Sequence, residues 1–196
     1  MPDYDARLEE LLPRLEQLWA QLGAPIADQL APGLTEAELS ARERAAGLSL
    51  PAELRIWWGW HDGVRRLQPG TRLGLESLVG VGPWEFLSCV ESLDERALMS
   101  RVAGELWQPT WLPVLAFDAH RVFVDCGQDQ DGRVPVRVWD AQPDDLDRHR
   151  LPSFAALVAL WVQLLEAGSV AWSDQRPVWP GGRQDLPAEL LATGLV

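Results

Sequence analysis

The side chains best suited to catalysis lie in one short stretch near the middle of the chain. They are Asp118, His120, Asp125 and Cys126. Such a set could form a Cys–His–Asp arrangement, in which a base activates a thiol nucleophile. However, Asp125 and Cys126 are adjacent in a predicted strand, where neighbouring side chains point to opposite faces. His120 lies in a predicted turn. We therefore interpret the stretch as turn residues and a buried thiol, and we expect the protein not to be an enzyme.

Metal-binding patterns are weak in this sequence. The three histidines, His61, His120 and His149, are scattered and lack the spacing of a metal-ligand set. Residues 129–132 read Asp-Gln-Asp-Gly, as in part of a calcium loop, but the EF-hand register would need a carboxylate at Val138. We interpret these four residues as part of a hairpin loop and expect no metal ion.

Cofactor motifs fail as well. Gly80-Val81-Gly82 is followed by Pro83 and does not follow a clear strand, so it does not match the dinucleotide-binding fingerprint. All 17 basic residues are arginine, which excludes a Schiff-base lysine and the lysine of a phosphate-binding P-loop. We therefore expect no cofactor.

The charge balance narrows the choice of partners. The 196-residue chain has 29 acidic and 17 basic residues, a net charge of −12. This disfavours nonspecific binding to nucleic acid or to anionic membranes. The longest charge-free apolar stretch, Leu151 to Leu165, is shorter than the ~20 residues that a membrane span needs. We expect a soluble protein with a basic protein partner and no membrane contact, and favour a monomer.

The two cysteines, Cys89 and Cys126, could form one disulfide. The first five residues are acidic where a secretory signal would be basic. We therefore predict a cytoplasmic protein with two buried, reduced thiols.

The first third of the chain is predicted to be helical. An apolar stripe runs through Asp5–Leu22, where Pro13 either kinks the helix or begins a second piece. A capping box at Thr35 begins a helix that runs to Ala46. Pro51 takes the first position of the next helix, which His61-Asp62-Gly63 ends.

The rest of the chain favours strands followed by one helix. A short strand is predicted at Trp84–Ser88 and a helix at Ser92–Val102, with Ser92 as its cap. An antiparallel meander follows, and its strands are Trp111–Phe117, Arg121–Cys126 and Val134–Asp140, with Pro135 marking an edge or a bulge. Ser153–Ala167 is the last helix.

This order predicts an α+β fold: N-terminal helices, a central antiparallel sheet and a C-terminal helix packed on the sheet. Residues 1–168 form one domain, and residues 169–196 form a tail laid over it, with Trp172 and Trp179 as anchors.

The eleven tryptophans could form a carbohydrate or peptide platform. We instead expect core positions for Trp19, Trp57, Trp111, Trp139 and Trp161.

Residues 32–168 resemble the SUKH superfamily, which includes bacterial toxin-immunity proteins and the yeast cell-wall-assembly regulator. The N-terminal part of the resemblance consists of Gly33-Leu34-Thr35, Glu43, Gly47, Leu50-Pro51 and Asp62-Gly63. The later part consists of Trp111-Leu112-Pro113, residues 122–125, the Gly127–Gly132 loop and Ser153-Phe154. No single motif is specific, and the match rests on their order and spacing.

The resemblance implies an immunity protein that binds a cognate toxin and blocks its active site without catalysis. A regulatory scaffold like the yeast protein is the alternative, and an enzyme using Cys126 and His120 is a third reading.

The acidic balance is concentrated in one region. Between Asp125 and Asp147 there are seven aspartates and two arginines. One interpretation is that these aspartates lie in solvent-exposed loops. The other is that they form a contact surface for a basic toxin, because complementary electrostatic fields accelerate association. If the toxin is a nuclease, the first contact candidates are Asp144, Asp145 and Asp147, followed by Asp129 and Asp131.

Overall fold

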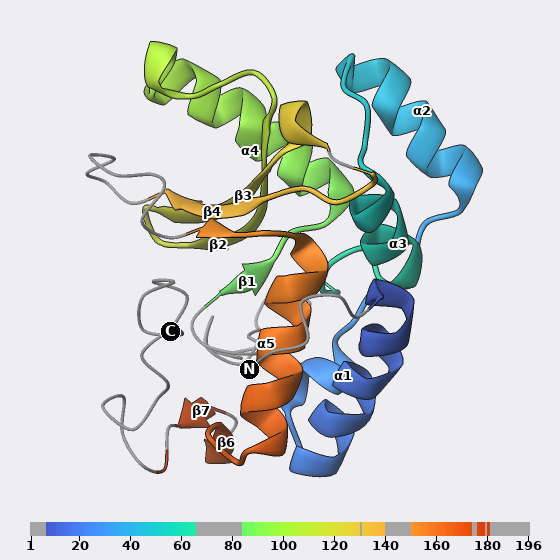
Figure 1. The fold of residues 1–196 in the computed structure, drawn as a ribbon, viewed down its shortest axis with the longest axis vertical. Helices are drawn as coiled ribbons and strands as arrows, with labels where there is room; N and C mark the ends of the chain where they lie inside the picture. Colours follow the sequence, from blue (N-terminus) through green and yellow to red (C-terminus); the bar gives the residue numbers. More distant parts are fainter. Residues whose placement is uncertain are drawn as a thin grey trace.

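A computed structural model describes residues 7–65, 84–129, 131–139, 150–173, 176–178 and 180, and it has an α+β fold (Figure 1). The helices are α1 (Leu8–Leu22), α2 (Glu36–Ala46), α3 (Ala52–Trp60), α4 (Cys89–Val102) and α5 (Phe154–Glu166). Short 3-10 turns are η1 (Pro25–Asp28), η3 (Gly104–Leu106) and η4 (Cys126–Gln128). The strands are β1 (Glu85–Phe86), β2 (Trp111–Phe117), β3 (His120–Asp125), β4 (Val136–Trp139), β5 (Arg150–Leu151), β6 (Ala171–Ser173) and β7 (Arg176–Val178).

The N-terminal helices begin and end close to the predicted residues. α1 is one continuous helix with Pro13 inside it, so no second piece begins there. The predicted capping box of α2 is confirmed: the Glu38 backbone N–H donates to Thr35 Oγ1, and the Thr35 N–H donates to the Glu38 carboxylate. Pro51 is the N-cap of α3, not its first helical residue. Its backbone is extended, and its carbonyl accepts from the N–H groups of Leu54 and Arg55.

The predicted start of α4 is wrong by one turn. The helix begins at Cys89, with Ser88 as its cap and Glu91 completing the capping box. Ser92 is instead buried inside the helix, where its hydroxyl donates to the Pro113 carbonyl. The sequence repeats the Ser-x-x-Glu spacing one turn apart, and Ser92 is the member of this pair that packs against β2.

The main sheet is antiparallel, with strand order β1-β2-β3-β4-β5, so the predicted meander is confirmed. Three predicted bounds are wrong: β3 begins at His120, which was predicted to lie in a turn, Cys126 begins η4 instead of ending β3, and β4 begins at Val136. Pro135 lies just before β4, where its carbonyl accepts from the Asp125 N–H. β4 is an internal strand between β3 and β5, and the irregularity in the ladder lies between Pro113 and Leu115 of β2.

The two faces of the sheet are packed differently. On one face, alternate strand residues such as Val122, Val124 and Val136 join the main core with α1, α3 and α5. On the other, Trp107, Trp111, Phe123 and Trp139 form a second aromatic cluster with Met99 of α4. Figure 1 shows α4 on one side of the sheet and α5 with α1 on the other.

α5 is buried more completely than predicted. Its expected apolar stripe is buried, and so are Ala155, Ala159 and Leu160 outside that stripe. The helix packs on α1 and beside the sheet (Figure 1). Core positions are confirmed for Trp19, Trp57, Trp111, Trp139 and Trp161. In the predicted tail, β6 and β7 pair as a hairpin and Trp172 packs partly buried against the core, whereas Trp179 lies outside the described residues.

Candidate functional site

The connection between β3 and β4 begins at a buried carboxylate. Asp125 Oδ1 accepts hydrogen bonds from Thr110 Oγ1 (2.9 Å) and from the Gly127 backbone N–H (3.1 Å). Asp125 Oδ2 accepts from Gln128 Nε2 (2.8 Å). These three bonds satisfy the buried carboxylate and fix the first residues of the connection, including the side chain of Gln128.

The two predicted contact aspartates that the structure describes lie further along this connection. Asp129 Oδ1 accepts from the Gly132 N–H at 2.7 Å, which closes a tight turn. Asp131 and Gly132 both have positive φ, +54° and +84°. Glycine suits the second position, because a Cβ there would also lie 3.1 Å from the Cβ of Ala52. Both aspartates are exposed, but the Asp129 carboxylate also shapes the turn.

A second buried carboxylate, Glu53, holds the far end of the connection. Its Oε2 accepts from the N–H groups of Val134 (3.0 Å) and Phe154 (3.1 Å), and its Oε1 accepts from that of Ala155 (2.9 Å). Burial raises the pKa of Glu53 above its ordinary value of 4.5, although the three donors favour the charged form. Glu53 therefore joins the start of α3 to the residues just before β4 and to the N-terminus of α5.

A cavity of about 540 Å³ opens between these two anchors. Its lining residues are Gln128, Asp131, Arg133, Pro135, Arg150 and Pro152. Arg150 Nη2 donates to Gln128 Oε1 at 3.4 Å. The described part of the predicted acidic region therefore has mixed charge, with Asp131 sharing a cavity with two arginines. Asp144, Asp145 and Asp147, the other predicted contacts, lie outside the described residues.

The structure does not bring together the residues considered for catalysis. His120 is the first residue of β3, and Cys126 follows its last residue, so that the six residues of the strand separate them by about 20 Å. Burial raises the pKa of the Cys126 thiol to about 12, which keeps it protonated near neutral pH. Asp118 lies in the β2–β3 turn with φ of +49°. This geometry disfavours a Cys126–His120 nucleophile.

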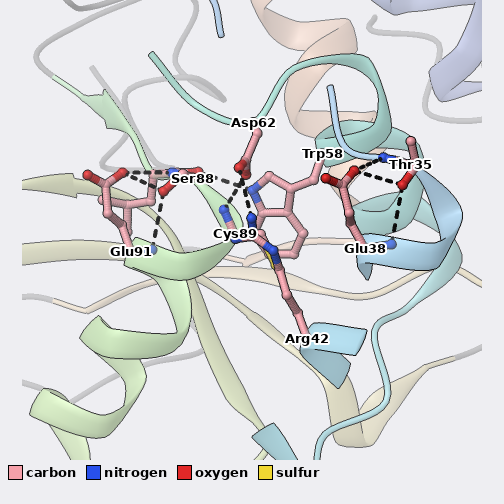
Figure 2. A network of polar contacts seen from close by, with 9 residues as sticks. Thr35, Glu38, Arg42, Trp58, Asp62, Ser88, Cys89 and Glu91 are labelled. Atoms are coloured by element: carbon pink, nitrogen blue, oxygen red, sulfur yellow. Dashed lines mark hydrogen bonds and ion pairs between the residues drawn. The ribbon is translucent and has the colours of Figure 1, made fainter. Parts of the chain in front are cut away.

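Asp62, one of the residues of the family resemblance, belongs to a polar network at the start of α4 (Figure 2). Asp62 Oδ1 accepts from the Cys89 N–H at 2.7 Å, and Asp62 Oδ2 pairs with Arg42 at 3.6 Å. Trp58 Nε1 donates to the Leu87 carbonyl at 3.1 Å. Burial raises the pKa of the Cys89 thiol to about 11. The network joins α2, the end of α3 and α4, so these contacts serve the fold.

Sequence reasoning missed Glu53, Gln128 and Arg150 as residues that shape the site. Glu53 was only weakly indicated by the sequence, as a carboxylate two residues after Pro51, the predicted first residue of the helix. Gln128 and Arg150 had no signal, because their contact joins segments 22 residues apart.

No family model matches the chain, and no curated protein matches it either. Among the described residues, no group of three or more His, Cys, Asp or Glu side chains is placed to hold a metal ion. Within the same part of the chain, no helix combines the length and apolar character needed to span a membrane.

Proposed function

We propose that this protein is a SUKH-type immunity protein that binds a cognate bacterial toxin stoichiometrically and blocks it without catalysis. It acts in the cytoplasm as a monomer, without a cofactor and without binding nucleic acid or membranes. The observation that carries the proposal is the ordered set of residues in the family resemblance, several of which hold the fold together. Thr35 caps α2, Glu43 Oε1 accepts from the Leu50 N–H at 2.6 Å, and Ser153 caps α5.

The charge of the chain supports a basic partner. A net charge of −12 attracts a cationic toxin and steers its approach. An acidic inhibitor can also present carboxylates where a nuclease toxin binds phosphates. The high pKa of the Cys126 thiol supports the non-catalytic reading.

Co-expression tests the proposal directly. The chain is produced together with the C-terminal domain of a large secreted protein encoded beside it, and growth and co-purification are measured. We expect the chain to relieve the growth arrest and to co-purify with the toxin domain in equal amounts. Growth arrest that persists despite soluble expression of both proteins would refute immunity and favour the alternative, a regulatory scaffold of the cell-wall-assembly type.

Charge reversal tests which acidic residues meet the toxin. The variant Asp144→Arg, Asp145→Arg, Asp147→Arg should slow association by about tenfold or more and reduce its salt dependence. Asp129→Arg with Asp131→Arg should have a smaller effect, because Asp129 is engaged in its own turn.

A matched control reverses three exposed acidic residues elsewhere, Asp28, Asp94 and Glu105. This variant has the same net charge as the triple variant. If both variants associate equally slowly, net charge acts alone and the loop is not the contact. If the triple variant associates as fast as the natural chain, the acidic-loop hypothesis is wrong.

A further inference from the structure

The cavity beside the β3–β4 connection gathers positive charge in an acidic protein. Two of its six lining side chains are arginines, Arg133 and Arg150, against one acidic side chain, Asp131. We propose that this cavity binds a small oxyanion, a carboxylate or a phosphate, through the guanidinium of Arg150 with support from Arg133. This site goes beyond the toxin-binding function and does not depend on it.

A chain of hydrogen bonds positions Arg150. Thr110 donates to the buried carboxylate of Asp125, Asp125 accepts from the Gln128 amide, and the amide oxygen accepts from Arg150 Nη2. Because Asp125 fixes the Gln128 amide through Nε2, the amide oxygen is placed to accept from one edge of the guanidinium. A guanidinium presents five N–H donors in a planar fork, so the bond to Gln128 leaves donors that can meet two oxygens of an anion.

Arg133 adds a second positive charge to the lining of the cavity. Its positive charge also lowers the pKa of Glu53, against the larger effect of burial. The N-terminus of α5 is not the anion-binding element, although it lies next to Pro152. Its first N–H groups already donate to Glu53 and to Ser153 Oγ. The arginines must therefore supply the attraction.

The cavity suits a small ligand. A volume of about 540 Å³ falls within the ~300–1,000 Å³ of small-molecule sites. Pro135 and Pro152 give it stiff walls, and the two buried carboxylates, Asp125 and Glu53, hold the segments on either side. Carboxylate and phosphate share the paired oxygens that an arginine fork recognises. Asp131 at the rim opposes ligands of high negative charge.

Titration of the full chain with two probes, inorganic phosphate and succinate, tests the site. Binding is followed by backbone amide chemical shifts in two-dimensional NMR at low ionic strength. We expect saturable binding of at least one probe with a dissociation constant of about 1 mM. The shift changes should be confined to residues 127–134 and 150–154. Tighter binding of phosphate or of succinate then identifies which oxyanion the cavity prefers.

Variants separate a built site from general attraction to arginine. Arg150→Gln should weaken binding by about tenfold. The matched control, Arg101→Gln, removes an exposed arginine at the end of α4 and should leave binding unchanged. Gln128→Ala retains both cavity arginines but releases Arg150, and should weaken binding about threefold. Asp131→Asn should strengthen it.

Three results would overturn the proposal. They are shift changes spread over the whole surface, equal losses in Arg150→Gln and Arg101→Gln, and absence of saturation by either probe. Each variant is first compared with the natural chain by its amide spectrum, so that loss of binding is read only from a folded protein.

Discussion

Residues 33 and 34 cross the end of α3 at a very short distance. The Leu34 N–H donates to the Trp58 carbonyl at 2.8 Å. A Cβ added to Gly33 would lie 1.9 Å from the carbonyl oxygen of Gly59, whereas a Cβ added to Gly59 would meet nothing closer than the Leu34 carbonyl at 3.7 Å. Space therefore requires glycine at position 33 but not at position 59.

The two glycines should respond to alanine with opposite sign. Gly33→Ala forces the crossing backbone apart and should lower the free energy of unfolding by about 2–4 kcal/mol. Gly59→Ala places a better helix former in the last turn of α3 and should raise it by about 0.5–1 kcal/mol. Urea unfolding followed by tryptophan fluorescence measures both. A Gly33→Ala variant as stable as the natural chain would show that the crossing is not tight.

Glu53 gives the fold a pH dependence of defined sign. Its pKa in the folded protein is raised above 4.5, mainly by burial. The folded state therefore binds its proton more tightly than the unfolded state, and this contribution to stability is full below about pH 4.5 and is lost as pH rises through the folded pKa. Most paired carboxylates have the opposite effect.

Glu53→Gln removes this titration while preserving the shape of the side chain. The stability advantage of the natural chain over Glu53→Gln should be largest at about pH 4 and should shrink as pH rises above 4.5 through the raised pKa of Glu53. Urea unfolding at a series of pH values measures it, with the exposed Glu10→Gln as the control. An advantage that grows with pH would contradict the raised pKa.

Glu53→Ala should lower the free energy of unfolding by at least about 3 kcal/mol, because three buried N–H groups lose their acceptor.

Contacts of this kind set the limit of prediction from sequence at the residue scale. The Glu53 carboxylate meets Val134 and Ala155, which lie 81 and 102 residues away along the chain. Local pattern carries no information on such pairs. The burial of Trp19 and Trp161, in contrast, followed from helical spacing within a single segment, and the structure confirms it.

At the scale of elements, the start of a helix depends on which of the possible capping side chains stays out of the core. The cap of α2 was predicted because Thr35 precedes a polar helix and has no competitor. α4 offered two Ser-x-x-Glu pairs, and only packing decides between them. Ser92 is buried against Pro113, so Ser88 becomes the cap and the helix gains a turn. That turn places the Cys89 N–H beside Asp62 (Figure 2).

Asp62 should therefore stabilise the junction of three helices. Asp62→Ala removes the acceptor of the Cys89 N–H and the partner of Arg42, and should cost about 2–3 kcal/mol. Asp62→Asn retains an acceptor oxygen and loses only the charge, so it should cost about 1 kcal/mol. Hydrogen exchange of the first turn of α4, measured with urea unfolding, should report the difference. Equal costs for both variants would show that the ion pair, not the N–H bond, matters.

At the scale of the whole molecule, the order of helices and strands was enough to predict the class of fold. The sheet lies between α4 on one face and α1, α3 and α5 on the other, which gives two cores of different composition. The second core was not foreseen, because its aromatic residues come from three different strands and from the segment before β2. Trp107 lies in none of the predicted elements and yet contacts Trp111, Phe123 and Trp139.

The net charge of −12 should make salt act in opposite directions on stability and on association. Raising NaCl from about 20 mM to about 300 mM shortens the screening length and relieves repulsion within the folded chain, so Tm should rise by about 2–4 °C. The same screening should slow association with a basic toxin domain by about tenfold. The Asp28→Arg, Asp94→Arg, Glu105→Arg variant carries half the net charge, and its Tm should respond about a quarter as strongly, because self-repulsion scales with the square of the net charge. A Tm that falls with salt in both proteins would instead show that ion pairs such as Arg121–Glu95 outweigh the net repulsion.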